Sequence, residues 1–279
     1  MNDIDEIRET QKKSWDKFSP GWKKWDDLTM GFLQPHGDEI IQCLNPKSTD
    51  IILDIAAGTG EPGLSIAPLI KEGKIVITDL SEGMLNVARE KANKSGIKNL
   101  ETKIADACNL PFDDNSFDGV SCRLGFMFFP DMNLAAKEMI RVLKPGGKLA
   151  TTVWGLPEKN FWITCIMKNI KEYIEMPTPI EGAPGMFRCA QSGLISSMFK
   201  EYGLNEVEDY EVNGMIECEN PEYFWNFMTE IAAPFVAALE GADNHIIESI
   251  KQGVIKDINN KHPQSTSLDT YGYVISGTK

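Results

Sequence analysis

Dense runs of lysine or arginine are missing from this sequence, in which 28 basic residues stand against 41 acidic ones. The formal net charge is −13, and the pI calculated from the sequence is about 4.8. Nucleic acids are held mainly through phosphate contacts from Lys and Arg, so this charge balance disfavours a DNA or RNA partner.

Closely spaced cysteine pairs and long apolar runs are missing too. None of the six cysteines forms a Cys-x-x-Cys pair, which argues against a zinc ribbon or a redox motif, and we expect no metal site. These are Cys43, Cys108, Cys122, Cys165, Cys189 and Cys218. No segment approaches the ~18 apolar residues that span a membrane. The acidic start Met1–Glu6 is unlike a signal peptide, so we expect a cytoplasmic protein.

A predicted strand, a glycine turn and a predicted helix over about 63–71 follow one another from Ile51 onward. The run 51–55 predicts a buried strand, and Gly58-x-Gly60-x-x-Gly63 matches the dinucleotide-binding pattern, which is weak evidence alone. Two acids, Asp54 and Glu61, flank the turn and would repel a pyrophosphate. They suit a ligand with an ammonium and a sulfonium, such as S-adenosylmethionine (SAM). Alternatively, Asp54 binds backbone N–H groups in the turn.

Two further acids follow predicted strands. Asp79 ends the strand 74–79 and lies 21 positions after Gly58, where such folds bind ribose hydroxyls. The alternative is an ordinary acid at a helix start. Asp106 follows the strand 100–104, and taken alone an Asp in a loop indicates little.

In order, these motifs resemble the class I SAM-dependent methyltransferases, and within them the quinone-biosynthesis branch. Leu53-Asp54-x-x-x-Gly58-x-Gly60 is similar to their first motif, and Leu143-Lys144-Pro145-Gly146-Gly147 to another hallmark. The resemblance covers about 51–154 and implies an α/β, Rossmann-like fold: a mostly parallel seven-stranded sheet with helices on both faces. It implies that Asp106 accepts the adenine amine. The implied cofactor-binding residues are Asp54, Ala56, Gly58, Thr59, Gly60, Asp79, Leu80, Met84, Asp106, Ala107 and Arg123. For Arg123, a cofactor carboxylate, an acceptor group and a surface acid all remain open as partners.

For the whole chain we expect a helical arm or lid over 1–45, a SAM-binding core over 46–156, and the remaining strands with a helical cap over 157–279. The arm should contain a helix at 4–18, broken at Ser19-Pro20-Gly21, and another at 36–44. About fifty residues separate the last two predicted strands, 206–213 and 271–277, which departs from the family's hairpin. We interpret the intervening helices, 221–240 and 243–259, as a cap over the acceptor. The predicted acceptor-binding residues are Trp22, Trp25, Met127, Phe128, Trp154 and Trp225.

The predicted function is methyl transfer from SAM to a small-molecule acceptor. The displaced sulfide leaves as a neutral group, so alignment and removal of water can supply much of the catalysis. No catalytic residue is assigned, because His36, His245, Tyr210 and Glu61 are all weak candidates for a base. A non-catalytic SAM-binding protein and an NAD-dependent oxidoreductase are the alternatives. Expected partners are the acceptor and, as an option, a second copy of the chain.

Overall fold

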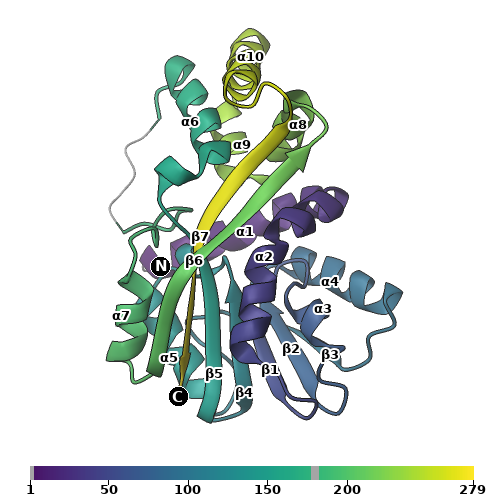
Figure 1. The fold of residues 1–279 in the computed structure, drawn as a ribbon, viewed down its shortest axis with the longest axis vertical. Coiled ribbons are helices and arrows are strands. Elements are labelled where there is room, and N and C mark those ends of the chain that lie inside the picture. Colours follow the sequence, from purple (N-terminus) through teal and green to yellow (C-terminus); the bar gives the residue numbers. More distant parts are fainter. Residues whose placement is uncertain (1–2, 177–181) are drawn as a thin grey trace.

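The computed structural model describes residues 3–176 and 182–279, and its described part is built on a seven-stranded sheet (Figure 1). The strand order is β3-β2-β1-β4-β5-β7-β6, and β7 is antiparallel to both of its neighbours. The strands are β1 (Ile51–Ile55), β2 (Lys74–Asp79), β3 (Leu100–Ile104), β4 (Phe117–Arg123), β5 (Leu143–Trp154), β6 (Asn205–Cys218) and β7 (Thr266–Thr278). The predicted α/β, Rossmann-like fold class is confirmed.

Helices cover both faces of this sheet because its strands are apolar on both sides. Helices α2 (Asp26–Leu44), α3 (Gly63–Ile66) and α4 (Glu82–Lys94) pack on one face, which includes Ile52 and Ile75. Helices α5 (Met132–Val142) and α7 (Leu194–Glu201) pack on the other, which includes Leu53 and Val120. Side chains alternate between faces along a strand, so the residues of one parity share a face.

A third group of helices stands over one end of the sheet (Figure 1). These are α1 (Asp3–Lys24), α6 (Phe161–Tyr173), α8 (Pro221–Ile231), α9 (Ala233–Leu239) and α10 (Asn244–Lys261), with short 3-10 turns η1 (Phe126–Phe128) and η2 (Pro157–Lys159) nearby. In the sequence, helices α8, α9 and α10 come between β6 and β7, two strands that pair directly with each other in the sheet. The single helix predicted over 221–240 is wrong, because the chain is extended at Ala232, just before Pro234.

The predicted break at Ser19-Pro20-Gly21 is also wrong, because α1 continues to Lys24. Pro20 has no N–H to donate to the Asp16 carbonyl, but the Ser19 hydroxyl donates to that oxygen at 3.0 Å instead. The helix predicted over 36–44 begins earlier, at Asp26, and carries Pro35 inside.

Helix α3 is shorter than the predicted helix 63–71, since it ends at Ile66, before Pro68. The Asn99 side-chain amide donates to the carbonyls of Ala67 and Ile70, both at 2.9 Å, which satisfies groups that a longer helix would have paired. Residues 176–188, whose three prolines and two glycines predict a long loop, lie partly outside the described residues.

Candidate active site

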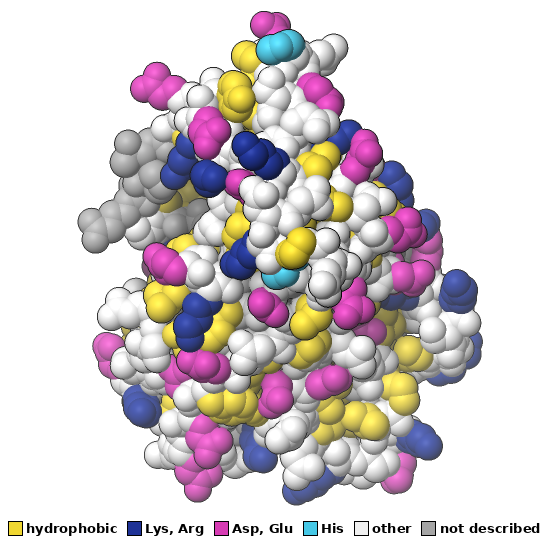
Figure 2. Space-filling model, turned by 45° about the horizontal axis from the view of Figure 1, so that its top comes forward, with side chains coloured by type: hydrophobic (Ala, Val, Ile, Leu, Met, Phe, Trp, Pro, Cys, Tyr) yellow, Lys and Arg dark blue, Asp and Glu magenta, His cyan; other side chains and the backbone are white. Residues whose placement is uncertain are grey.

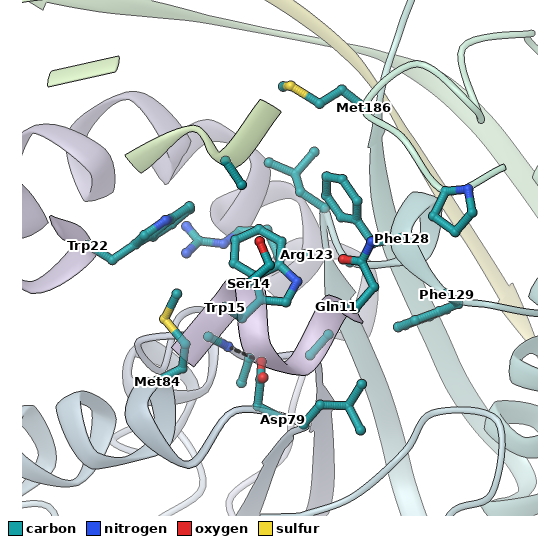
Figure 3. A pocket seen from close by; sticks show the side chains of 18 of the residues that line it. Gln11, Ser14, Trp15, Trp22, Asp79, Met84, Arg123, Phe128, Phe129 and Met186 are labelled. Carbon is teal, nitrogen blue, oxygen red and sulfur yellow. Dashed lines mark hydrogen bonds between the residues drawn. The ribbon is translucent and has the colours of Figure 1, made fainter. Parts of the chain in front are cut away.

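A cavity of about 280 Å³ opens at the carboxyl ends of β1, β2, β4 and β5 (Figure 3). Ligands of open α/β sheets bind outside these strand ends. Its walls come from the glycine turn after β1, from α1 and α2, from the start of α6, and from the end of α8 with the residues that follow it. Segments far apart in the sequence therefore meet at one site.

The glycine turn forms the floor of this cavity, and close packing explains its composition. Gly58 has φ +55° and Gly60 has φ +106°, backbone conformations that residues other than glycine rarely adopt. Gly58 and Thr59 line the cavity, whereas Gly60 packs beneath the turn against Leu64. A Cβ at Gly63 would lie 2.5 Å from the Ile77 side chain, so glycine lets α3 approach β2 closely.

Asp54 is fully buried under the turn, not at the cavity surface. Its Oδ1 accepts from the Ser121 hydroxyl at 2.7 Å, and its Oδ2 accepts from the Gly63 N–H at 3.0 Å. Burial raises the pKa of this carboxyl to about 7, although Ser121 and Arg123 oppose the shift. This geometry favours the alternative in which Asp54 shapes the turn. Glu61, by contrast, lines the cavity.

Asp79 lies at the end of β2, between the glycine turn and α4. Its Oδ2 accepts from the Gly58 N–H at 2.9 Å, and its Oδ1 accepts from the Ser81 N–H at 2.9 Å. Each carboxylate oxygen has a second lone pair, so the group can still accept from a ligand. Burial raises its pKa to about 6. Leu80 and Met84 line the cavity beside it.

Asp106 and Ala107 line the cavity after β3, as the sequence predicts for neighbouring strand ends. The Asp106 Oδ1 accepts from the Cys108 N–H at 2.9 Å. Its Oδ2 accepts from the Arg8 Nε at 2.6 Å. Sequence reasoning missed Arg8, because no local pattern connects two residues 98 positions apart.

Arg123 ends β4 on the same face as Ser121 and therefore points toward α2. Its guanidinium donates to the Leu33 carbonyl at 3.4 Å and contacts the Met30 sulfur at 3.6 Å, both long distances. Burial lowers its pKa, while Glu61 and Asp54 act against this through space. The side chain stays partly exposed because it borders the cavity (Figure 3). Arg123 and Glu61 thus present opposite charges to one cavity.

Aromatic side chains line much of the remaining wall, and we call this set the aromatic wall. It consists of Trp15, Trp22, Phe32, Phe128, Phe129, Trp154 and Trp162. Trp15 packs edge-on against Phe128 with ring centroids 5.5 Å apart, and Trp154 packs against Trp162 at 5.1 Å. The structure brings Trp22, Phe128 and Trp154 to the cavity, as the sequence predicts. The prediction missed four residues of this wall, because an apolar pattern indicates that a side chain is buried but not what it packs against. They are Trp15, Phe32, Phe129 and Trp162.

Three other residues that the sequence predicts to bind the acceptor lie in the core instead. Trp25 packs against Tyr223 and Phe227, and Trp225 and Met127 are buried away from the cavity wall. Of the four weak base candidates, only Glu61 lines the cavity among the described residues. His36 is fully buried, and its burial lowers its pKa to about 3.

Comparison with known proteins identifies the family. The ubiE/COQ5 methyltransferase family matches residues 23–162. A demethylmenaquinone methyltransferase from Listeria monocytogenes is 31% identical over 212 residues, covering 70% of this chain and 87% of the relative. One from Bacillus subtilis is 30% identical over 208 residues, covering 69% and 82%. The chain belongs to the ubiE/COQ5 methyltransferase family. As in that family, the methyl donor is SAM, and the reaction class is methyl transfer.

Solved structures agree on the fold. The YcgJ protein from Bacillus subtilis superimposes with a TM-score of 0.58 at 21% identity, covering 88% of this chain and 98% of that one. Phosphoethanolamine N-methyltransferase 2 from Haemonchus contortus, solved with SAM, gives 0.52 at 20%, covering 87% and 52%. At such low identity these similarities show the class I methyltransferase fold alone.

Two surface properties bear on partners. Within residues 3–176 and 182–279, no helix is both long and apolar enough to cross a membrane. On the face shown in Figure 2, basic and acidic side chains of the described residues are interspersed, with no broad basic area.

Proposed function

We propose that this methyltransferase holds SAM along the strand ends and transfers its methyl group to a small apolar or aromatic acceptor. The observation that carries the proposal is one cavity that joins the predicted nucleoside residues to the aromatic wall (Figure 3). A cofactor and a second, less polar compound can thus meet in one enclosed place.

The residues at the strand ends fit the chemistry of SAM. Asp79 has acceptor capacity for the ribose hydroxyls, and Asp106 for the adenine amine. Glu61 and Arg123 suit the ammonium and the carboxylate of the methionine end, since they are oppositely charged and border the same cavity. A Cβ at Gly58 would meet no atom within 4 Å, so a ligand has room against the backbone there. Leu80 and Met84 supply apolar contacts.

When bound, SAM supplies a methyl group on a positively charged sulfur, which needs no acid to leave. The chain's own contribution is then to orient the acceptor and to exclude water. Well-oriented reactants account for ~7–11 kcal/mol of a barrier. In the described residues, the titratable side chains that line the cavity are Glu61, Asp79, Asp106 and Arg123, all at the cofactor end. We therefore assign alignment to the aromatic wall and name no general base.

The aromatic wall supports an apolar or aromatic acceptor, because flat apolar rings stack well on such side chains. The curated relatives are named for demethylmenaquinone, which is a reason to include reduced naphthoquinones among the compounds tested. Simple phenols, thiols and amines complete the panel. The acceptor that is methylated identifies the substrate class.

The test has two stages. Calorimetry should detect binding of SAM, or of its demethylated product S-adenosylhomocysteine, and none of NAD. Asp79→Asn keeps the side-chain shape and removes its charge, so we expect roughly tenfold or more weaker binding from losing charge-assisted hydrogen bonds. The matched control is Asp113→Asn, in an exposed loop. Labelled SAM is then incubated with the acceptor panel. Tight NAD binding without SAM binding would contradict the proposal.

A further inference from the structure

Arg8 pairs with Asp106, which lines the cavity, and the proposed function leaves this contact unexplained. The Arg8 Nε lies 2.6 Å from the Asp106 Oδ2, within a partly buried ion pair whose side chains are 28% and 14% exposed. The other oxygen of Asp106 is turned to the backbone N–H of Cys108. Both oxygens of this carboxylate are therefore engaged by the protein itself.

Helix α1 closes the nucleoside end of the cavity in the same arrangement. Its residues Gln11, Ser14 and Trp15 line the cavity (Figure 3). The next residue of the helix is Asp16, whose Oδ1 accepts from the Ser81 hydroxyl at 2.6 Å and from the Gly83 N–H at 3.1 Å. Thus α1 is fastened to both loops that carry the proposed nucleoside contacts, the one after β2 and the one after β3.

An adenine amine received by Asp106 would have to share this carboxylate with the Arg8 guanidinium, whose Nε already lies 2.6 Å from Oδ2. We propose that Arg8 is an internal competitor for Asp106, so that α1 holds the nucleoside end closed until the adenine amine displaces the guanidinium. This inference rests on the proposed function, in which Asp106 receives that amine.

Arg8 has a second acceptor available when it is displaced. Its Nη1 also donates to Asp5, on the same helix, at 2.5 Å. When the guanidinium leaves Asp106, it therefore stays charged and keeps one carboxylate partner. Arg8 is also partly exposed, so water can solvate it as it moves. The free-energy cost of this exchange of partners is therefore small. A small cost suits a contact that must break each time the cofactor enters.

The experiment measures binding of S-adenosylhomocysteine by calorimetry and by stopped-flow fluorescence. Arg8→Met keeps much of the stem and removes the charge, and Arg8→Gln is a second variant. A partly exposed ion pair of this kind corresponds to about a 2–5-fold change in an equilibrium constant. We expect both variants to bind about 2–5-fold tighter and to associate faster than the unmodified protein. Lys13→Met, at an exposed position of the same helix, is the matched control and should change neither quantity.

Two further measurements separate competition from a general loosening of α1. In an Asp106→Asn background, replacing Arg8 should have no further effect on binding, because the competitor acts only through that carboxylate. An inosine analogue of the ligand, which lacks the exocyclic amine, should gain nothing from Arg8→Met. Amide hydrogen exchange of residues 4–16 in the ligand-free protein should rise in Arg8→Met and stay unchanged in Lys13→Met.

The outcomes are distinguishable. Unchanged or weaker binding in both Arg8 variants overturns the competition, as does an equal gain in Lys13→Met or a gain that persists with Asp106→Asn. Failure of the unmodified protein to bind S-adenosylhomocysteine at all is a different result, because it contradicts the proposed function and not the role of Arg8.

Discussion

Replacing Gly21 with alanine should separate α1 from α8 and so weaken the part of the cavity wall that α1 forms. Helices α1 and α8 cross so closely at this residue that a Cβ there would lie 2.2 Å from the carbonyl oxygen of Glu230. Real Cβ contacts essentially never fall below 3.0 Å, so the helices must separate by about 0.8 Å. The obstacle is backbone, which cannot rotate away as a flexible side chain does.

The expected cost follows from the contacts at this crossing. Trp22 donates to the Ile231 carbonyl at 3.2 Å, and Trp25 donates to the Glu230 carboxylate at 2.9 Å. Weakening these bonds costs about 0.5–3 kcal/mol, and overpacking adds about 1–3 kcal/mol. The exposed Lys24–Glu230 pair adds about 0–1 kcal/mol. Alanine regains up to about 1 kcal/mol of helix propensity. With the propensity gain subtracted, these ranges sum to a net loss of about 0.5–6 kcal/mol.

Gly31→Ala is the matched control, since Gly31 is an exposed helical glycine whose added Cβ would meet nothing within 4 Å. Helix propensity alone then predicts a gain of about 0.5–1 kcal/mol. Urea unfolding followed by tryptophan fluorescence measures both free energies, and hydrogen exchange of residues 4–24 shows whether α1 opens locally instead. Equal stability of the two variants, with unchanged exchange in α1, would refute the close crossing.

Two further predictions concern the cavity itself. Because burial raises the Asp79 pKa to about 6, the carboxylate is mostly protonated at pH 5, and SAM binding should be about tenfold weaker there than at pH 7.5. Calorimetry in Asp79→Asn should show a smaller drop over this range, and any drop that remains is assigned to Asp54, whose pKa burial raises to about 7. An unmodified protein without the drop would contradict a role for ionised Asp79. Once an acceptor is known, Trp162→Phe should lower kcat/KM several-fold with unchanged SAM affinity, while Trp225→Phe, in the core, should lower stability alone. Equal kinetic effects in the two variants would show that the wall has no special role.

The cofactor end could be predicted from sequence because it depends on strand ends. Asp79 ends the apolar strand β2 and Asp106 follows the strand β3, and parallel neighbours bring such residues to one edge of the sheet. Asp54 and Glu61 show where this reasoning stops. Both flank the glycine turn in the sequence, but Asp54 shares its strand face with Ile52 and faces Gly63 instead of the cavity. Asp54 lies inside β1 and is covered by the turn, whereas Glu61 lies in the turn itself, and the sequence pattern does not give the depth of either side chain.

The acceptor end was predicted less well because tertiary contacts decide it. Trp22 and Trp25 stand three positions apart, and both looked equally suited to a lid. The unbroken course of α1 through Pro20 turns Trp22 toward the cavity, while Trp25 falls at the start of α2 and packs against Tyr223. A proline taken as a break thus concealed which tryptophan faces the site.

The position of the inserted helices follows from the direction of the strands. The end of β5 at Trp154 borders the cavity, and β7, antiparallel to it, pairs Gly272 with that residue. The β6–β7 connection therefore leaves the sheet at the same edge, where Cys218 pairs with Thr266. Any insertion into this connection must lie above the carboxyl ends of the parallel strands (Figure 1). Helices α8 and α9 accordingly supply Met228 and Pro234 to the cavity wall, so this connection can vary the acceptor end while the cofactor strands stay unchanged.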